Sequence, residues 1–222
     1  MKRRLLAAAL VVTATSALIA NRVTAQSEGA SATSQQPDAD EMKAMMDGVQ
    51  KYMEGIKPGK HHQPLKHFVG SWETVTKMWW SGPGTDPIVT KGASEIKWVL
   101  GGRFVMDEHK GKMMMPDMSG SMKEIDYEGI GMTGYNNERN MYEQIWASSA
   151  QTNMLTMKGG LDPSGKVFTL YGEMDEVMLG VVGRTVKYVT RILDADKHVF
   201  EIIDLHAGDD YKVVEITYTR KK

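Results

Sequence analysis

The sequence predicts an all-β fold: a single antiparallel up-and-down β-barrel of about eight to ten strands, preceded by an amphipathic helix. From Gly70 onward, apolar and polar residues alternate, as in VKYVTRIL and YKVVEITYTR, which is the period of a half-buried strand. Clusters of turn residues such as Gly82-Pro83-Gly84 separate these segments. Because the connections are short hairpins and a long open sheet would expose its edges, a closed barrel is favoured over a sandwich.

Residues 1–25 are typical of a signal peptide. Basic residues at positions 2–4 precede an uncharged apolar run over residues 5–20, and small residues lead to an expected cleavage after Ala25. The run is shorter than the roughly 20 residues that cross a bilayer, so cleavage is favoured over a retained anchor, and no stable membrane span is expected afterwards. We therefore expect an exported protein, periplasmic or secreted. The absence of cysteine means that its fold forms without disulfides.

Residues 26–40 are small and polar and are expected to form a flexible linker. Residues 41–57 are expected to form the amphipathic helix, because apolar side chains recur at helical spacing and Asp38 with Glu41 resembles a capping box. The apolar residues of this helix are Met42, Met45, Met46, Val49, Met53 and Ile56. Residues 58–222 then form the barrel domain, which has an ordinary size for one hydrophobic core.

Charge excludes one class of partner. Cleavage after Ala25 removes four basic side chains and no acidic one, so the formal charge changes from −1 to −5. A mildly acidic chain without a run of Lys or Arg lacks the electrostatic footprint of a nucleic-acid-binding protein. The sequence does not indicate an oligomeric state.

The first and last predicted strands carry residues that would close the barrel. Alternate residues of the first strand are uncharged and are expected to face the interior: Trp72, Thr74, Thr76, Met78 and Trp80. When the barrel closes, the guanidinium of Arg220 can stack on the indole of Trp72. With Gly70, this pair resembles the structural signature of lipocalins and the wider calycin group, in which its role is structural.

A larger set of residues extends from position 58 to 220. The set comprises Pro58-Gly59, His62, Leu65, Gly70, Trp72, the GGRF of residues 101–104, Gly134-Tyr135-Asn136, Tyr142, Trp146, Gly165 and Tyr218-Thr219-Arg220. This set resembles the DUF1579 family of bacterial, often exported, proteins of unknown function. Asn136 stands where this pattern leads us to expect Asp. The resemblance implies a lipocalin-like barrel and implies no activity.

Two groups of residues have the composition of a metal site. Residues 106–122 hold six Met and His109, which suits Cu(I), but the contiguous Met113-Met114-Met115 favours a hairpin loop whose side chains cover the barrel mouth. The second group consists of His61, His62 and His67, and it has no acidic partner at ligand spacing. A capping or packing role for His62 is therefore favoured over a metal site. We therefore predict neither a metal nor another cofactor.

Two sequence patterns that could suggest a catalytic or nucleotide-binding site are better explained by structural roles of their residues. Residues 129–134 fit G-x-G-x-x-G, but strand-like residues follow them, so the glycines are expected to mark sheet bending or close packing. Glu124, Asp126 and Glu128 share one strand face, and a solvated outer face is favoured because burying unpaired carboxylates costs several kcal/mol. Hydrolase motifs and a cysteine nucleophile are lacking, and no catalytic residue is assigned.

The remaining aromatic and basic residues of the strands are candidates for ligand binding: Trp80, Trp98, Arg103, Tyr135, Trp146 and Arg184. The aromatics either bound a cavity or fill the barrel, and the sequence leaves both open. We expect a non-enzymatic binder of a small apolar or amphipathic molecule, with Arg103 or Arg184 orienting an acidic head group. The alternatives are a small-molecule enzyme, which a polar and titratable barrel interior would favour, and a structural or envelope-interaction protein.

Overall fold

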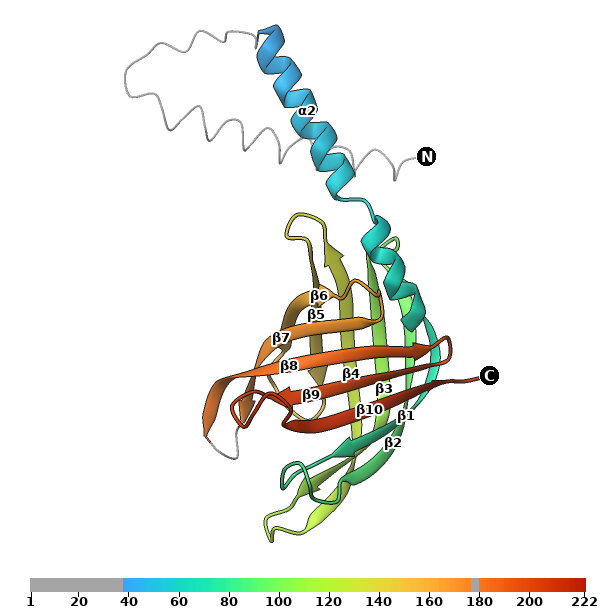
Figure 1. Cartoon of the computed structure of the whole chain (residues 1–222), viewed down its shortest axis with the longest axis vertical. Helices are drawn as coiled ribbons and strands as arrows, with labels where there is room; N and C mark the ends of the chain where they lie inside the picture. The colour runs from blue at the N-terminus through green and yellow to red at the C-terminus, as the bar shows by residue number, and fades with distance from the viewer. Residues whose placement is uncertain (1–37, 177–179) are drawn as a thin grey trace, which may run out of the picture. The chain divides into compact units, whose positions relative to one another are not determined.

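Ten antiparallel strands close into one barrel in the computed structural model, which describes residues 38–176 and 180–222. Each strand pairs with the next along the chain, and the last strand returns beside the first (Figure 1). The predicted all-β, up-and-down barrel is therefore confirmed. The signal peptide predicted at residues 1–25 and the linker up to residue 37 lie outside the described residues.

The strands follow the alternation of the sequence. In chain order they are β1 (Gly70–Met78), β2 (Ile88–Val99), β3 (Phe104–Pro116), β4 (Met122–Asn136), β5 (Met141–Ser148), β6 (Leu155–Leu161), β7 (Val167–Glu176), β8 (Val181–Asp194), β9 (Lys197–Asp204) and β10 (Lys212–Arg220). In β1, Trp72 and Thr74 are buried while Glu73 between them is exposed. The register of β1 and β10 then places Trp72 opposite Arg220.

Helix α2 (Ala39–Gly55) is the predicted N-terminal amphipathic helix. One oxygen of Asp38 accepts hydrogen bonds from the backbone N–H groups of Asp40 and Glu41, each at 2.9 Å. The Glu41 carboxylate accepts a hydrogen bond from the Asp38 N–H at 3.3 Å, which completes the expected capping box. Among the helices of the described ranges, none is both long and apolar enough to cross a membrane.

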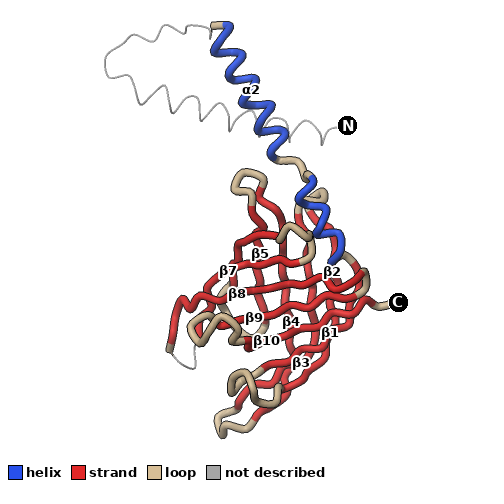
Figure 2. Tube along the Cα trace, in the orientation of Figure 1, coloured by secondary structure: helices blue, strands red, loops and turns tan. Residues whose placement is uncertain are grey.

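A short 3-10 helix, η1 (Lys60–Phe68), lies at one end of the barrel (Figure 2). Its Leu65 is fully buried in the core, and the Phe68 carbonyl accepts a hydrogen bond from Trp72 Nε1 at 2.7 Å. The Arg220 guanidinium lies 4.1 Å from the centre of the Trp72 ring and donates to two backbone carbonyls, one of η1 and one of the residue that follows it. These contacts tie η1 to both strands that close the barrel.

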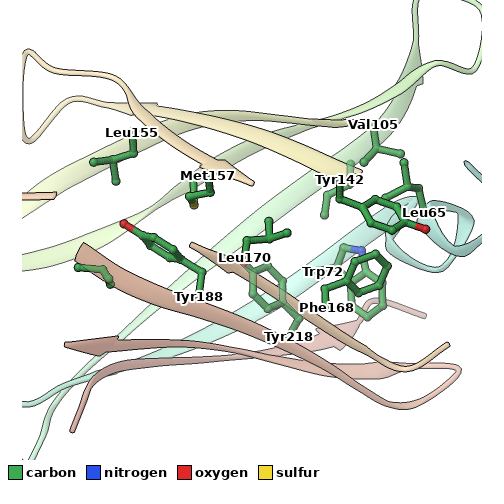
Figure 3. Packing of buried hydrophobic residues seen from close by; sticks show 12 residues of the cluster. Leu65, Trp72, Val105, Tyr142, Leu155, Met157, Phe168, Leu170, Tyr188 and Tyr218 are labelled. Carbon is green, nitrogen blue, oxygen red and sulfur yellow. The ribbon is translucent and has the colours of Figure 1, made fainter. Parts of the chain in front are cut away.

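The buried aromatic side chains gather at this closed end. Figure 3 shows Trp72 and Phe168 beside Leu65 of η1, whereas Leu155 and Tyr188 lie farther along the strands. Several of their contacts are edge-to-face, as between Tyr142 and Phe168, whose ring centres are 4.9 Å apart. The closed end is therefore a packed core, and space inside the barrel is found beyond it.

The Met-rich segment differs from the loop expected within residues 106–122. β3 continues through Met113 and Met115 to Pro116, and only residues 117–121 turn before β4 begins. Ion pairs across the outer face accompany this extension, with Lys112 Nζ 2.8 Å from the Asp126 carboxylate. Cross-strand pairing of opposite charges, which does not depend on apolar alternation, explains why the strand runs on.

The carboxylates of β4 lie on the outer face, as predicted. Glu124, Asp126 and Glu128 are exposed, and all three pair with lysines of β3. Their charges therefore belong to the solvated surface and not to the barrel interior.

Candidate functional site

A cavity of about 250 Å³ occupies the barrel interior. Its lining runs from Gln144, midway along β5, and Tyr218 of β10 to Met78, Trp80 and Met114 near the strand ends remote from η1. A barrel of this size can hold one small molecule among its inward side chains. Of the two arrangements that the sequence left open, the structure therefore shows a cavity beyond a packed end.

Apolar and aromatic side chains form most of the cavity wall. Five methionines contribute to it: Met78, Met113, Met114, Met157 and Met174. Their unbranched thioether chains adapt to irregular shapes and make favourable contacts with aromatic groups. Trp80, which is 41% exposed, stands at the outer end of the wall, and Trp146 lies deeper.

Trp146 lies against β4 because two glycines leave room for its indole ring. A Cβ atom at Gly131 would come within 2.7 Å of the ring, and one at Gly129 would overlap it. The indole Nε1 donates a hydrogen bond to the Tyr127 hydroxyl at 3.1 Å, which fixes the orientation of the ring. The glycines of residues 129–134 thus serve close packing, as the sequence predicted.

A polar cluster lies among the apolar side chains of the interior. Ser94 of β2 and His109 of β3 are buried cross-strand partners, and Ser94 Oγ is 3.0 Å from His109 Nδ1. Burial lowers the pKa of His109, so its imidazole is neutral at pH 7. The Tyr218 hydroxyl shares this interior, and burial holds its pKa well above the usual value. These groups can donate and accept hydrogen bonds without carrying charge.

Asp107 is the acid of this cluster. It stands two residues before His109 on the same face of β3 and lines both the large cavity and a smaller one. Its Oδ1 is shielded from solvent, and no described residue offers it a hydrogen bond. Burial raises the pKa of Asp107 to about 7, with the Ser94 hydroxyl opposing this rise and the Glu108 charge adding to it.

The smaller cavity, about 80 Å³, lies between this cluster and η1. Phe68 and His198 line it on the side of the closed end. Four residues line both cavities and therefore form the partition between them: Asp107, Gln144, Phe200 and Tyr218. The small cavity has room for a few water molecules, so the ligand-sized space is the larger one.

The structure separates the aromatic residues that the sequence grouped as ligand contacts. Trp80 and Trp146 both line the large cavity. Trp98 and Tyr135 instead pack against the core, and the Tyr135 ring stacks on His61 with a centroid distance of 4.6 Å. Position along the strand decides the difference, because Trp98 and Tyr135 lie at the strand ends next to η1.

The two arginines expected to orient a head group line neither cavity. Arg103 donates to the backbone carbonyls of Ile56 and Leu100, at 3.0 and 3.1 Å, and so holds the chain that enters η1. Arg184 forms a short, half-buried ion pair with Asp204, at 2.7 Å. Both guanidinium groups are therefore engaged by the protein itself.

Two of the three histidines of η1, His61 and His62, have structural partners in Tyr135 and the Gly59 backbone. His62 Nδ1 accepts a hydrogen bond from the Gly59 N–H at 3.0 Å, a capping contact at the start of η1. Burial is the main cause that lowers the pKa of His62. Within residues 38–176 and 180–222, no group of three or more His, Asp or Glu side chains is arranged to hold a metal ion.

Asp107 and Ser94 were not among the site residues expected from the sequence. A signal was present, since Val105, Asp107 and His109 alternate along one strand and therefore share a face. A charged residue between a buried valine and a histidine is unusual on an inward face. The sequence alone could not decide which face of β3 pointed inward.

The matched family agrees with the resemblance noted in the sequence. The family model described as "Protein of unknown function (DUF1579)" matches residues 57–220. The chain belongs to the DUF1579 family. The match includes η1 and every strand of the barrel in the described residues, so the cavity lies within the DUF1579 region. No curated protein matches the chain.

Two solved structures resemble the DUF1579 barrel. A de novo designed fluorescence-activating β-barrel has 12% identity and a TM-score of 0.36, over 70% of this chain and 95% of the designed one. An S-type phycobiliprotein lyase from Guillardia theta has 12% identity and a TM-score of 0.46, over 77% of this chain and 97% of the lyase. Both likenesses are too weak to carry an argument about function.

Proposed function

We propose that this DUF1579 protein is a non-enzymatic binder that holds one small, largely apolar molecule inside its barrel. The observation that carries the proposal is the 250 Å³ cavity, whose wall combines methionines with Trp80 and Trp146. An apolar pocket with a few polar groups is the usual form of a small-molecule site. Because residues 1–25 predict export, we infer that the ligand is met in the periplasm or outside the cell.

The wall of the cavity sets the expected affinity. A ligand that buries about 200 Å² of apolar surface gains roughly 5 kcal/mol. Part of this gain offsets the lost translational and rotational freedom, so polar contacts must contribute if binding is to be micromolar. The methionines make the site tolerant of ligand shape.

A neutral fluorescent probe, N-phenyl-1-naphthylamine, tests the proposal. We expect one probe to bind per chain with increased fluorescence, and we expect Met174→Trp to weaken binding at least tenfold because the larger side chain fills the cavity. Ile130→Trp is the matched control, since Ile130 is exposed on the outer face of β4. The proposal fails if the wild-type protein does not bind the probe, or if both variants bind it equally well.

An acid–base enzyme is a second candidate function, and Asp107 is the observation that favours it. A carboxyl group with a pKa of about 7 that lines a cavity can accept or donate a proton near neutral pH. His109 and Tyr218 stand in the same interior as hydrogen-bonding groups. Mass spectrometry of molecules that co-purify with the protein separates the candidates: a binder returns them unchanged on incubation, whereas an enzyme converts them and Asp107→Asn abolishes the conversion.

A further inference from the structure

The charges inside the barrel are not balanced. Asp107 is the one carboxyl group in the described linings of the two cavities. Lys112 is the one lysine or arginine there, but its side chain is 48% exposed and its Nζ lies 2.8 Å from the Asp126 carboxylate. An ionised Asp107 therefore has no cationic partner within the described interior.

The groups around Asp107 do not supply a positive charge either. Its cross-strand neighbours are Ile96 on β2 and Gly131 on β4, which offer no side-chain donor. The titratable groups that share its cavities are His109 and Lys112 on β3, Tyr127 on β4, Tyr188 on β8, His198 on β9 and Tyr218 on β10. Burial lowers the pKa of both histidines and raises the pKa of Tyr188 and Tyr218, so these four groups are neutral at pH 7. Glu108, the adjacent residue, adds negative charge.

We propose that the ligand of this barrel is an organic cation, an apolar molecule bearing a protonated amine that pairs with Oδ1 of Asp107. The inference rests on the proposed binding function and names the chemical class of the ligand. The apolar body would lie against the methionines and Trp146, and the ammonium group would reach the partition between the two cavities. Tyr188, whose buried hydroxyl has no hydrogen-bond partner among the described residues, offers a further polar contact in the same cavity.

Electrostatics favours a cation over the other ligand classes. A buried carboxylate without a cationic partner costs several kcal/mol, and an ammonium group offsets this cost through a charge-assisted hydrogen bond. A neutral hydroxyl would offset less of it, and an acidic ligand would add a second negative charge next to Asp107. The arginines that could have received an acid are engaged elsewhere, Arg103 by backbone carbonyls and Arg184 by Asp204.

Three naphthalene probes that differ in one group test the inference: 1-naphthylmethylamine, 1-naphthylmethanol and 1-naphthoic acid. Isothermal titration calorimetry at pH 8 should show the amine binding at least tenfold more tightly than the alcohol, with the acid weakest. Below pH 7 the affinity for the amine should fall about tenfold per pH unit as Asp107 becomes protonated, because the amine itself remains protonated. The affinity for the alcohol should change little.

Asp107→Asn should remove both the preference for the amine and its pH dependence, whereas Glu108→Gln, at an adjacent residue that lines neither cavity, should keep both. If Asp107→Asn does not fold, the pH dependence of the wild-type protein still decides. Equal binding of amine and alcohol at pH 8, or tightest binding of the acid, would overturn the cation while leaving the barrel a binder. If none of the three probes binds, the proposed binding function itself is contradicted.

Discussion

Arg220 holds the closed end of the barrel together through several partners at once. Its guanidinium lies 4.1 Å from the centre of the Trp72 ring and donates to the carbonyls of His67 and Val69, each at 2.8 Å. Gly70 leaves the space for this group, because a Cβ atom there would come within 2.5 Å of Nη1. The planar fork of donors, and not only the positive charge, is what this site uses.

We therefore predict that Arg220→Lys destabilises the protein by roughly 2–3 kcal/mol, because an ammonium group cannot stack on Trp72 and reach both carbonyls together. Urea denaturation followed by tryptophan fluorescence measures the change. Arg191→Lys is the matched control, because the half-exposed side chain of Arg191 pairs with Glu201 at 3.2 Å. This variant should lower the free energy of unfolding by less than about 0.5 kcal/mol. Equal losses in the two variants would show that the guanidinium fork has no special role.

The sequence could place Trp72 and Arg220, but it could not place Asp107. Strand parity and barrel closure are enough to make the ends of β1 and β10 meet. The alternation along β3 does not show whether Asp107 faces the interior or the solvent. The polar cluster around Asp107 also includes Ser94 of β2, which is 13 residues earlier in the chain. The polar cluster exists only once the register of β2 and β3 is known.

At the scale of elements, β6 and β7 approach closely at a glycine. A Cβ atom at Gly159 would overlap the Thr169 carbonyl oxygen and come within 2.7 Å of Leu170 Cα, both of which belong to the backbone of β7. Backbone atoms cannot rotate away as a side chain would. At the next residue, Gly160, a Cβ atom meets nothing within 4 Å.

This pair of adjacent glycines gives a matched prediction. Gly159→Ala should lower the free energy of unfolding by roughly 3 kcal/mol or prevent folding, because the two strands must separate to admit the methyl group. Gly160→Ala should change it by less than about 0.5 kcal/mol. Circular dichroism and thermal unfolding of both variants check the prediction, and similar melting temperatures for the two would contradict the close approach of β6 and β7.

The strands were predictable wherever turn residues separate alternating segments, and the prediction was incomplete where they do not. Met113-Met114-Met115 shows no alternation, and Pro116 is typical of a strand end, so nothing in the local pattern indicated a continued strand. β3 nevertheless reaches Pro116, paired with β4 along its whole length. Charge complementarity between Lys112 and Asp126 is a cross-strand property that local alternation does not show.

For the whole molecule, the sequence predicted a barrel but could not tell whether its interior was filled. Trp98 and Trp146 are both inward aromatic residues that pack against the core, yet only Trp146 also lines the cavity. Their roles differ because η1 covers one end of the barrel with Leu65 and Phe68. Side chains from every strand together determine whether the interior is filled, so the sequence of a single segment cannot show it.

The closed end also determines how the stability of the molecule should depend on pH. The His198 ring stacks on the Tyr218 ring with a centroid distance of 4.3 Å and contacts the Trp72 ring edge-to-face. Its Nδ1 is buried, and no residue in the described part of the chain gives it a hydrogen bond. Burial, with smaller contributions from His67 and Arg220, lowers the pKa of His198 to about 3 from its ordinary 6.5. Between these two values the unfolded chain binds more protons, so the contribution of His198 to stability is complete above pH 6.5 and is lost progressively toward pH 3.

Asp107 acts in the opposite direction. Its pKa is raised from 3.8 to about 7 in the folded protein, so its contribution to stability is complete below pH 3.8 and is lost as the pH rises to 7. Asp107 therefore opposes the loss of stability that His198 causes on acidification, whereas His62 and His109, whose pKa values burial also lowers, add to that loss. A substitution at His198 is needed to separate its contribution from the others.

We predict that His198→Phe, which keeps an aromatic ring in the stack, makes the protein less sensitive to acid. The stability of the variant relative to the wild type should increase by roughly 2 kcal/mol between pH 7 and pH 5, which corresponds to about 1.4 kcal/mol per pH unit below 6.5. Urea unfolding at the two pH values measures this difference, and His206→Phe, at an exposed histidine, is the matched control. If the His198→Phe difference were the same at both pH values, His198 would have to titrate alike in the folded and unfolded chains, and the closed end would admit water to its imidazole.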